Sequence, residues 1–282
     1  MNRLRIVHTT GFRYAGDASA SYNEARMLPG STPDQVVLYA HLDISPLSAQ
    51  YGYVDYFGTQ VTSFEVLHPH TQLSLTATSL VEVHPQATPV EPASWSALAA
   101  AAGGALETVE QLARSPRCDP PDEVAAIAAA IAADETDPHW AALRIARTLA
   151  EQMEYVPGAT WVGTTAAEAW AARKGVCQDI SHVTLGALRS VGIPARYVSG
   201  YLHPSVEPDI GETVSGESHA WIEWFDGARW SGWDPTNLIE IGDRHVRVGT
   251  GRDYADVAPL RGIYSGASDS ELFVTVEITR EA

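Results

Sequence analysis

Cysteine is the most reactive nucleophile among the residue types of this chain, and it occurs only twice, as Cys118 and Cys177. Cys177 lies in the segment KGVCQDISHV, directly after Gly175 and Val176. The apolar residues that follow it recur at the spacing of one helical face, which places Cys177 in the first turn of a helix. Free N–H groups at a helix N-terminus stabilise a thiolate and can bind an oxyanion, so this position suits a nucleophile. A buried, inert cysteine is the alternative, because cysteine is common in protein cores.

A predicted hairpin, HAWIEWFDGARWSGWDP (residues 219–235), supplies a histidine partner for the cysteine. Asp226-Gly227 is a strong signal for a two-residue turn. With these residues in the turn, His219 directly faces Asp234 across the two strands, with Cβ atoms about 5.5 Å apart. A four-residue loop centred on the same dipeptide preserves this pairing, whereas a three-residue loop shifts it. An aspartate that orients a histidine completes a Cys-His-Asp triad, in which the histidine takes the thiol proton.

The other candidate residues for chemistry are weaker. Cys118 lies in a proline-bounded loop, and no histidine stands at a spacing from it that would predict a contact. His182 follows Cys177 on the same predicted helix and points away from it, so packing is its expected role. His68 and His70 flank a proline in a turn, with no cysteine or carboxylate cluster beside them, so we expect no metal site. The glycine patterns of phosphate and dinucleotide sites are missing from the sequence, and we expect no cofactor.

Composition restricts the partners and the compartment. The chain has 282 residues, and 45% of them are hydrophobic, which is enough for a sizeable core. The net charge of −17 argues against nucleic acid and against an anionic membrane surface as partners. The N-terminal segment lacks the apolar region of a secretory signal, no apolar run approaches the length of a membrane span, and two cysteines cannot form a disulfide framework. A cytoplasmic protein is the simplest interpretation.

The periodicity of the chain changes along its length and predicts three regions. Residues 1–84 alternate between apolar and polar, with turn residues between the runs, which predicts a β-rich domain. Residues 85–135 begin with a proline linker and continue with alanine-rich helices. Residues 136–282 contain helices, one of them started by a capping box of Thr165 and Glu168, then strands, and end with a strand in ELFVTVEITR. This order predicts an α+β fold, with the N-terminal domain packed on the part that carries the candidate site.

Three segments resemble, in order, the bacterial transglutaminase-like family: GVCQDISHVTLGALRSVGIPARYVSGYL, SHAWIEWFDGARWSGWDPTN and GRDYADVAPLRGIYSG. SYNEARMLP and the strands after it also resemble the β-rich N-terminal region of bacterial members. The resemblance implies a papain-like transglutaminase core. In such a core a helix carries Cys177 as nucleophile, and an antiparallel sheet carries His219 as base and Asp234 as orienting acid. Ile180-Ser181 stand where the family has an aromatic-alanine pair, a departure that leaves these three residues in place.

The resemblance leaves two features of the site open. Relatives use an upstream tryptophan or glutamine as a second oxyanion donor. Trp161 and Trp170 are the candidates here, and we retain Trp161, although a packed aromatic side chain is an equal alternative for each. In GRDYADVAPLRG, four residues could line the cleft, Arg252, Asp253, Tyr254 and Asp256, but a structural ion-pair network is the interpretation we favour.

The expected reaction is cleavage of an amide bond through a thioester on Cys177. If water resolves the thioester, the protein is a peptidase or amidase, which we favour because water needs no dedicated acceptor site. If an amine resolves it, the protein is a protein-glutamine transamidase. A non-catalytic protein-binding module is the third alternative, and the intact Cys177, His219 and Asp234 argue against it. We expect a peptide or protein substrate, while its identity and the oligomeric state of the protein stay open.

Overall fold

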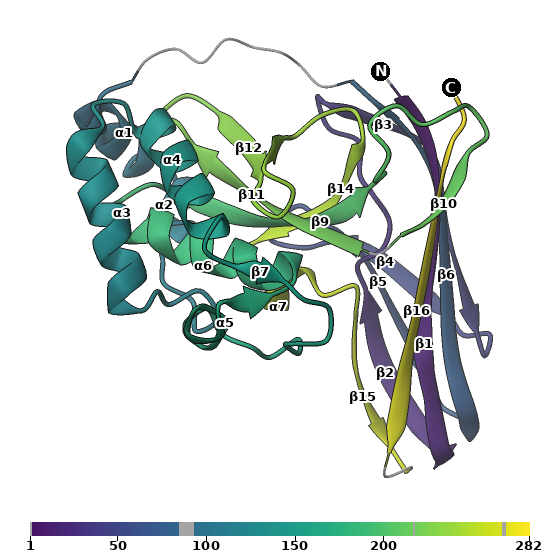
Figure 1. Cartoon of the computed structure of the whole chain (residues 1–282). Coiled ribbons are helices and arrows are strands. Elements are labelled where there is room, and N and C mark those ends of the chain that lie inside the picture. Colours follow the sequence, from purple (N-terminus) through teal and green to yellow (C-terminus); the bar gives the residue numbers. More distant parts are fainter. Residues whose placement is uncertain (1, 85–92, 217, 267–268) are drawn as a thin grey trace.

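A computed structural model describes four stretches of the chain, which are residues 2–84, 93–216, 218–266 and 269–282. The predicted linker prolines Pro85, Pro89 and Pro92 lie outside these described residues. The fold is α+β, with most helices on one side of the molecule and the long strands on the other (Figure 1). The helices are α1 (Trp95–Ala102), α2 (Leu106–Glu110), α3 (Asp122–Asp134), α4 (Pro138–Ala150), α5 (Ala166–Ala172), α6 (Cys177–Ser190) and α7 (Tyr254–Val257).

The strands form antiparallel sheets, apart from the short parallel pair β7-β8. In the first part of the chain they are β1 (Asn2–Ala18), β2 (Ala20–Ala25), β3 (Gln35–Ser45), β4 (Gln50–Val54), β5 (Gln60–Val66) and β6 (His70–Val83). In the second part they are β7 (Glu154–Tyr155), β8 (Lys174–Gly175), β9 (Ala195–Leu202), β10 (Thr213–Gly216), β11 (Ser218–Phe225), β12 (Trp230–Asp234), β13 (Ile239–Glu240), β14 (His245–Gly251), β15 (Leu260–Ser265) and β16 (Ser270–Arg280).

Two sheets, with the strand orders β10-β16-β1-β6-β3 and β15-β2-β5-β4, make up the strand-rich half. Phe64, Leu73 and Leu75 belong to the core that joins them. The predicted strands of the N-terminal region are therefore present, but both sheets also take strands from the other end of the chain. β16 pairs with β1 from Leu4–Arg280 onward, and β15 pairs with β2. The division into 1–84, 85–135 and 136–282 stays a prediction. The β1-β16 and β2-β15 pairings join strands that lie on opposite sides of its boundaries.

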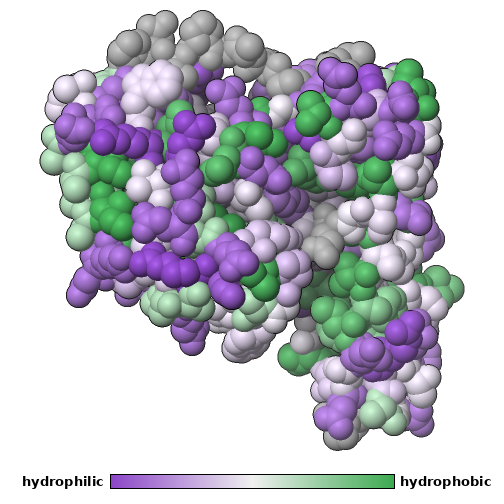
Figure 2. Space-filling model, in the orientation of Figure 1, coloured by the Kyte–Doolittle hydropathy of each residue, from purple (hydrophilic) through white to green (hydrophobic). Residues whose placement is uncertain are grey.

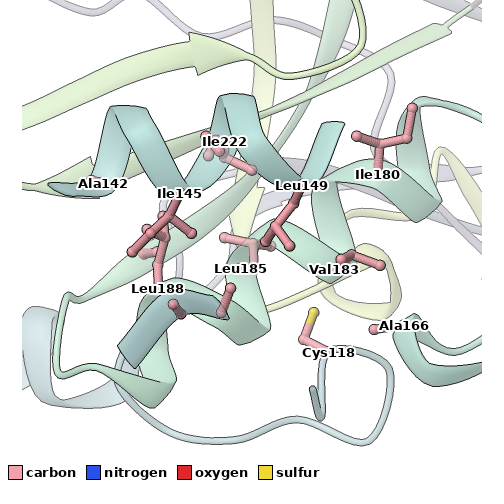
Figure 3. Close-up of a cluster of buried hydrophobic side chains, with 14 of the residues drawn as sticks. Cys118, Ala142, Ile145, Leu149, Ala166, Ile180, Val183, Leu185, Leu188 and Ile222 are labelled. Atoms are coloured by element: carbon pink, nitrogen blue, oxygen red, sulfur yellow. The ribbon is translucent and has the colours of Figure 1, made fainter. Parts of the chain in front are cut away.

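Helix α6 lies at the centre of the second core, which also contains side chains of β9, β11 and β12 from the sheet β13-β12-β11-β9-β14. Figure 3 shows Leu185 and Leu188 of α6 among Ile145 and Leu149 of α4 and Ile222 of β11. Burial of each such side chain contributes about 1.5–3 kcal/mol, so this core holds α6 firmly in place. The helix that carries the cysteine is thus a rigid base for a reactive group.

The two halves share a third core. Ile6 of β1, Val81 of β6 and Ile278 of β16 pack against Tyr201 of β9 and Val246 of β14. The N-terminal region is therefore packed on the part that carries the candidate site, as predicted.

The surface differs between the two halves. In Figure 2 apolar colour gathers at the lower right, where Figure 1 draws β15 and β16, and these strands carry the exposed Ile263, Leu272 and Val274. This area lies away from helix α6. Within the described part of the chain, no helix is both long enough and apolar enough to cross a membrane.

Candidate active site

Cys177 is the first residue of α6, as the periodicity predicted, and its side chain is partly exposed. Asp179 fixes this helix start, because its Oδ2 accepts the backbone N–H of Val176 at 2.8 Å. Gly175 lets the chain pass close to that carboxylate, since a Cβ there would lie 2.6 Å from the Asp179 Cβ. The thiol therefore stands beside the unpaired N–H groups of the first helical turn, where an anion is favoured.

Asp179 also ties the preceding loop to α6. Thr160 donates its hydroxyl hydrogen to Asp179 Oδ2 at 2.6 Å. Asp179 is buried, and burial raises the pKa of its carboxyl in spite of the hydrogen bonds from Thr160 and Val176. The sequence reasoning missed this role, although Asp179 stands at the third helical position, where a capping acid is expected.

Trp161 belongs to that tied loop, and its side chain is 73% exposed. The ring lies against Gly163, where a Cβ would come within 2.1 Å of it. The next residue, Val162, is held through its carbonyl oxygen, which accepts from Gln178 Nε2 at 3.4 Å and from Arg117. Trp161 thus lies on a loop anchored to the helix of Cys177, and its role as oxyanion donor stays a prediction.

His219 and Asp234 form the predicted hydrogen bond. His219 Nε2 lies 2.7 Å from Asp234 Oδ2, and the Asp234 side chain is fully buried. The Cys177 side chain lies near enough to raise the pKa of His219, and with Nε2 bound to Asp234, Nδ1 is the ring nitrogen left for the thiol. The structure therefore brings Cys177, His219 and Asp234 together.

The strand register behind this contact differs from the prediction by two residues. Phe225 pairs with Trp230 and not with Ala228. The predicted direct pairing of His219 with Asp234 is therefore wrong. Because side chains alternate between faces with a period of two, a shift of two residues leaves both on the same face as diagonal neighbours. The two side chains span the diagonal distance, so the predicted contact is present although the predicted register is wrong.

The physical reason for the shift is the side chain of Asp226. Its Oδ1 accepts the N–H groups of Ala228 and Arg229, at 3.0 Å each, as in an Asx-turn. The N–H of Asp226 donates to the Arg229 carbonyl at 2.9 Å, which closes the hairpin one residue later than predicted. Gly227 and Ala228 are then the turn residues, and Gly227 takes a φ of +109°, which favours glycine.

Asp234 has further partners that the sequence reasoning did not identify. Its Oδ1 accepts the backbone N–H groups of Thr236 and Asn237 at 3.0 and 3.1 Å. Its Oδ2 accepts from Asn237 Nδ2 at 2.8 Å, and His245 Nε2 lies 3.5 Å away. The Asp-Pro-Thr-Asn turn was a local signal for the first three contacts. No local signal pointed to His245, which arrives from β14.

These contacts control the charges of the pair. Burial alone would lower the pKa of His219, but the hydrogen bonds to Asp234 and Cys177 and the charges of both raise it to about 10. Burial alone would raise the pKa of Asp234, but hydrogen bonds from His219, His245 and Asn237 hold it well below its usual range. The arrangement therefore favours a protonated His219 beside an ionised Asp234 at neutral pH.

Three residues that were considered as candidate site residues from the sequence have structural roles instead. Cys118 is 1% exposed, and burial raises the pKa of its thiol to about 12. His182 is buried, and its Nε2 accepts the backbone N–H of Tyr254 at 3.2 Å. Trp170 is buried and donates its indole N–H to Glu123 at 2.8 Å, so that donor is already used. Among the described residues, we find no group of three or more His, Cys, Asp or Glu side chains that could hold a metal ion.

The GRDYADV segment forms an ion pair, the interpretation favoured from the sequence, with Arg252 Nε 2.9 Å from Asp256 Oδ2. The carbonyl of Arg252 accepts from Arg189 Nη2 of α6 at 2.6 Å. With the Tyr254–His182 contact, this segment is fastened to the helix that carries Cys177.

A cavity of about 930 Å³ is lined in part by ring neighbours of His219. Its lining includes Trp221 and His245, whose rings lie 6.3 and 6.4 Å from the His219 ring, centroid to centroid. None of Cys177, His219 and Asp234 is in the lining, so the cavity is separate from these three residues.

Comparisons with known proteins identify the family of this chain. Residues 4–82 match the bacterial transglutaminase-like N-terminal region, and residues 125–235, which contain all three candidate residues, match the transglutaminase-like superfamily. An uncharacterised protein of Mycobacterium leprae is 43% identical over 100% of both chains. An uncharacterised protein of Mycobacterium tuberculosis is 32% identical over 98% of this chain and 92% of its own.

Among solved structures, a candidate cysteine protease from Cytophaga hutchinsonii has the same fold. It matches 99% of this chain and 97% of its own with a TM-score of 0.75, at 20% sequence identity. With both regions matched in order and relatives aligned over nearly the whole length, this chain belongs to the bacterial transglutaminase-like family.

Proposed function

We propose that this protein is a cysteine-dependent amide hydrolase, a peptidase or amidase that acts on a peptide or protein through a thioester. The observation that carries the proposal is the hydrogen bond between His219 and the buried Asp234, beside Cys177 at the start of α6. An inert core cysteine, such as Cys118, has no such partner. The buried carboxylate and the raised pKa of His219 support a thiolate–imidazolium pair, which is the reactive form of a cysteine nucleophile.

In the proposed reaction the Cys177 sulfur attacks the amide carbonyl carbon, and the carbonyl oxygen becomes an oxyanion. The N–H groups in the first turn of α6 stabilise this oxyanion, with the Trp161 indole as the second donor. His219 gives its proton to the leaving amine, and the thioester forms. Water then attacks the thioester while His219 takes its proton, and release of the acid restores the thiol. Asp234 orients the ring and stabilises the imidazolium throughout.

The test is a panel of peptides, isopeptides and glutamine amides, each assayed with and without an added primary amine. Hydrolysis is expected from the wild-type protein and from Cys118→Ala, the matched control that removes the buried thiol. Cys177→Ala should lose turnover and keep its melting temperature. Wild-type turnover in Cys177→Ala would overturn the assignment of the nucleophile.

The same panel separates the alternatives. Incorporation of the amine in place of hydrolysis would make the protein a transamidase, because the first step is shared and only the acceptor differs. Selective labelling of Cys177 by iodoacetamide at neutral pH is expected of an enzyme. If Cys177 is no more reactive than a free thiol and no substrate turns over, a non-catalytic binding module is the better description.

A further inference from the structure

His245 is a buried histidine that the proposed reaction leaves without a role. It is the first residue of β14, and its ring lies between two groups. Its Nδ1 lies 3.2 Å from the backbone nitrogen of Gly242, and its Nε2 lies 3.5 Å from Asp234 Oδ2. The ring packs edge-on against Trp221, with centroids 5.3 Å apart at 72°. His245 therefore has a fixed position behind the carboxylate.

The Gly242 contact determines which nitrogen of the ring carries the proton. A backbone N–H can only donate, so Nδ1 of His245 must accept with its lone pair. In the neutral ring the hydrogen is then on Nε2, directed at Asp234. His245 is thus a hydrogen-bond donor to the same oxygen that binds His219.

The Gly242 contact also favours the neutral ring, because a proton on Nδ1 would face another N–H. The charged and titratable groups that act on His245 are Asp234 of β12, His219 of β11 and the adjacent Arg244. Burial lowers the pKa of His245, and the opposite influence of Asp234 does not overcome it. A neutral His245 leaves His219 as the cation that pairs with Asp234.

We propose that His245 is a positioning residue, whose Nε2–H holds Asp234 Oδ2 in place for His219 while its neutral ring leaves the negative charge of the carboxylate to the His219 imidazolium. It acts through Asp234 and needs no contact with a substrate. The catalytic meaning of this role rests on the proposed function. The hydrogen positions and charges do not, and they can be measured without any substrate.

Two substitutions separate the two contacts of the ring. In His245→Gln the terminal amide reaches the place of Nε2, so the variant keeps a donor to Asp234 and loses the acceptor for Gly242. In His245→Asn the shorter amide occupies the place of Nδ1, so the variant keeps the acceptor and loses the donor. A role in positioning Asp234 predicts that only Asn impairs the site. A role only in closing the 242–245 turn predicts that only Gln does.

The first measurement is the rate of Cys177 alkylation by iodoacetamide as a function of pH. In His245→Asn the rate at neutral pH should fall about threefold to tenfold and its profile should move to higher pH, because the long hydrogen bond to Asp234 is lost. In His245→Gln it should stay within about twofold of wild type, since a donor is retained. The reverse pattern, or no change in either variant, would overturn the proposal.

The second measurement is the nitrogen NMR of the histidine rings. At neutral pH we expect His245 neutral with its proton on Nε2, and His219 protonated on both nitrogens. A proton on Nδ1 of His245, or a charged His245, would overturn the proposal even if the variants failed to fold. If Cys177 were unreactive in the wild type while the NMR matched, the proposed function would fail and the positioning of Asp234 would stand.

Discussion

Substitution of Asp234 by asparagine tests the His219–Asp234 contact directly. Oδ1 of the new side chain can still accept the backbone N–H groups of Thr236 and Asn237. Its NH₂ group would then replace Oδ2 and face the Nε2–H of His219, donor against donor. The ring can relieve this only by moving its hydrogen to Nδ1, toward Cys177, where it can no longer take the thiol proton.

The size of the effect follows from the pKa of His219, which lies about 3.5 above its usual 6.5. That difference corresponds to about 5 kcal/mol, and Asp234 contributes more of it than Cys177 does. Removal of the carboxylate charge should therefore cost the imidazolium about 3 kcal/mol, close to a hundredfold in the population of the thiolate–imidazolium pair. We expect Asp234→Asn to lower alkylation of Cys177 and amide turnover at neutral pH by about this factor.

The assay is the pH profile of iodoacetamide alkylation, followed by mass spectrometry of the Cys177 peptide. Asp226→Asn is the matched control, because it removes another buried carboxylate from the same hairpin without a contact to His219. The control should lower the melting temperature and leave the profile in place, whereas Asp234→Asn should move the profile upward by about two pH units. An unchanged profile in folded Asp234→Asn would refute the reasoning.

The charge on His219 should stabilise the fold fully below about pH 6.5 and lose this effect as pH rises toward the folded pKa of about 10. The melting-temperature advantage of wild type over His219→Gln should shrink over that range, and a constant advantage would contradict the assignment. Gly186→Ala gains about 1 kcal/mol of helix propensity, but its Cβ would lie 2.0 Å from the Cys118 carbonyl oxygen, so we expect a net loss of about 1–2 kcal/mol. Denaturant unfolding measures this change in the free energy of unfolding, and a more stable variant would show that the Cys118 backbone moves to make room for the new Cβ. Iodoacetamide should modify Cys177 in the folded protein and Cys118 only after unfolding, which mass spectrometry can follow; equal rates would mean that the core is open.

The local parts of the site could be predicted from the sequence. The apolar spacing after Cys177 places the thiol at a helix start, because a helix repeats every 3.6 residues whatever surrounds it. The capping box of Thr165 and Glu168 is present for the same reason, since its bonds lie within one turn. The shared face of His219 and Asp234 depends only on strand alternation, so it survived a register error of two residues.

The turn position also had a local cause, which the sequence reasoning overlooked: the Asp226 carboxylate accepts the N–H groups of Ala228 and Arg229. Other features were decided by tertiary structure alone. His245 reaches Asp234 from another strand, and β16 pairs with β1 from the opposite end of the chain. Periodicity specifies which face of an element is buried, but not which distant element covers it. That choice is made by the packing of whole sheets and helices, where the fit of many side chains is decided together.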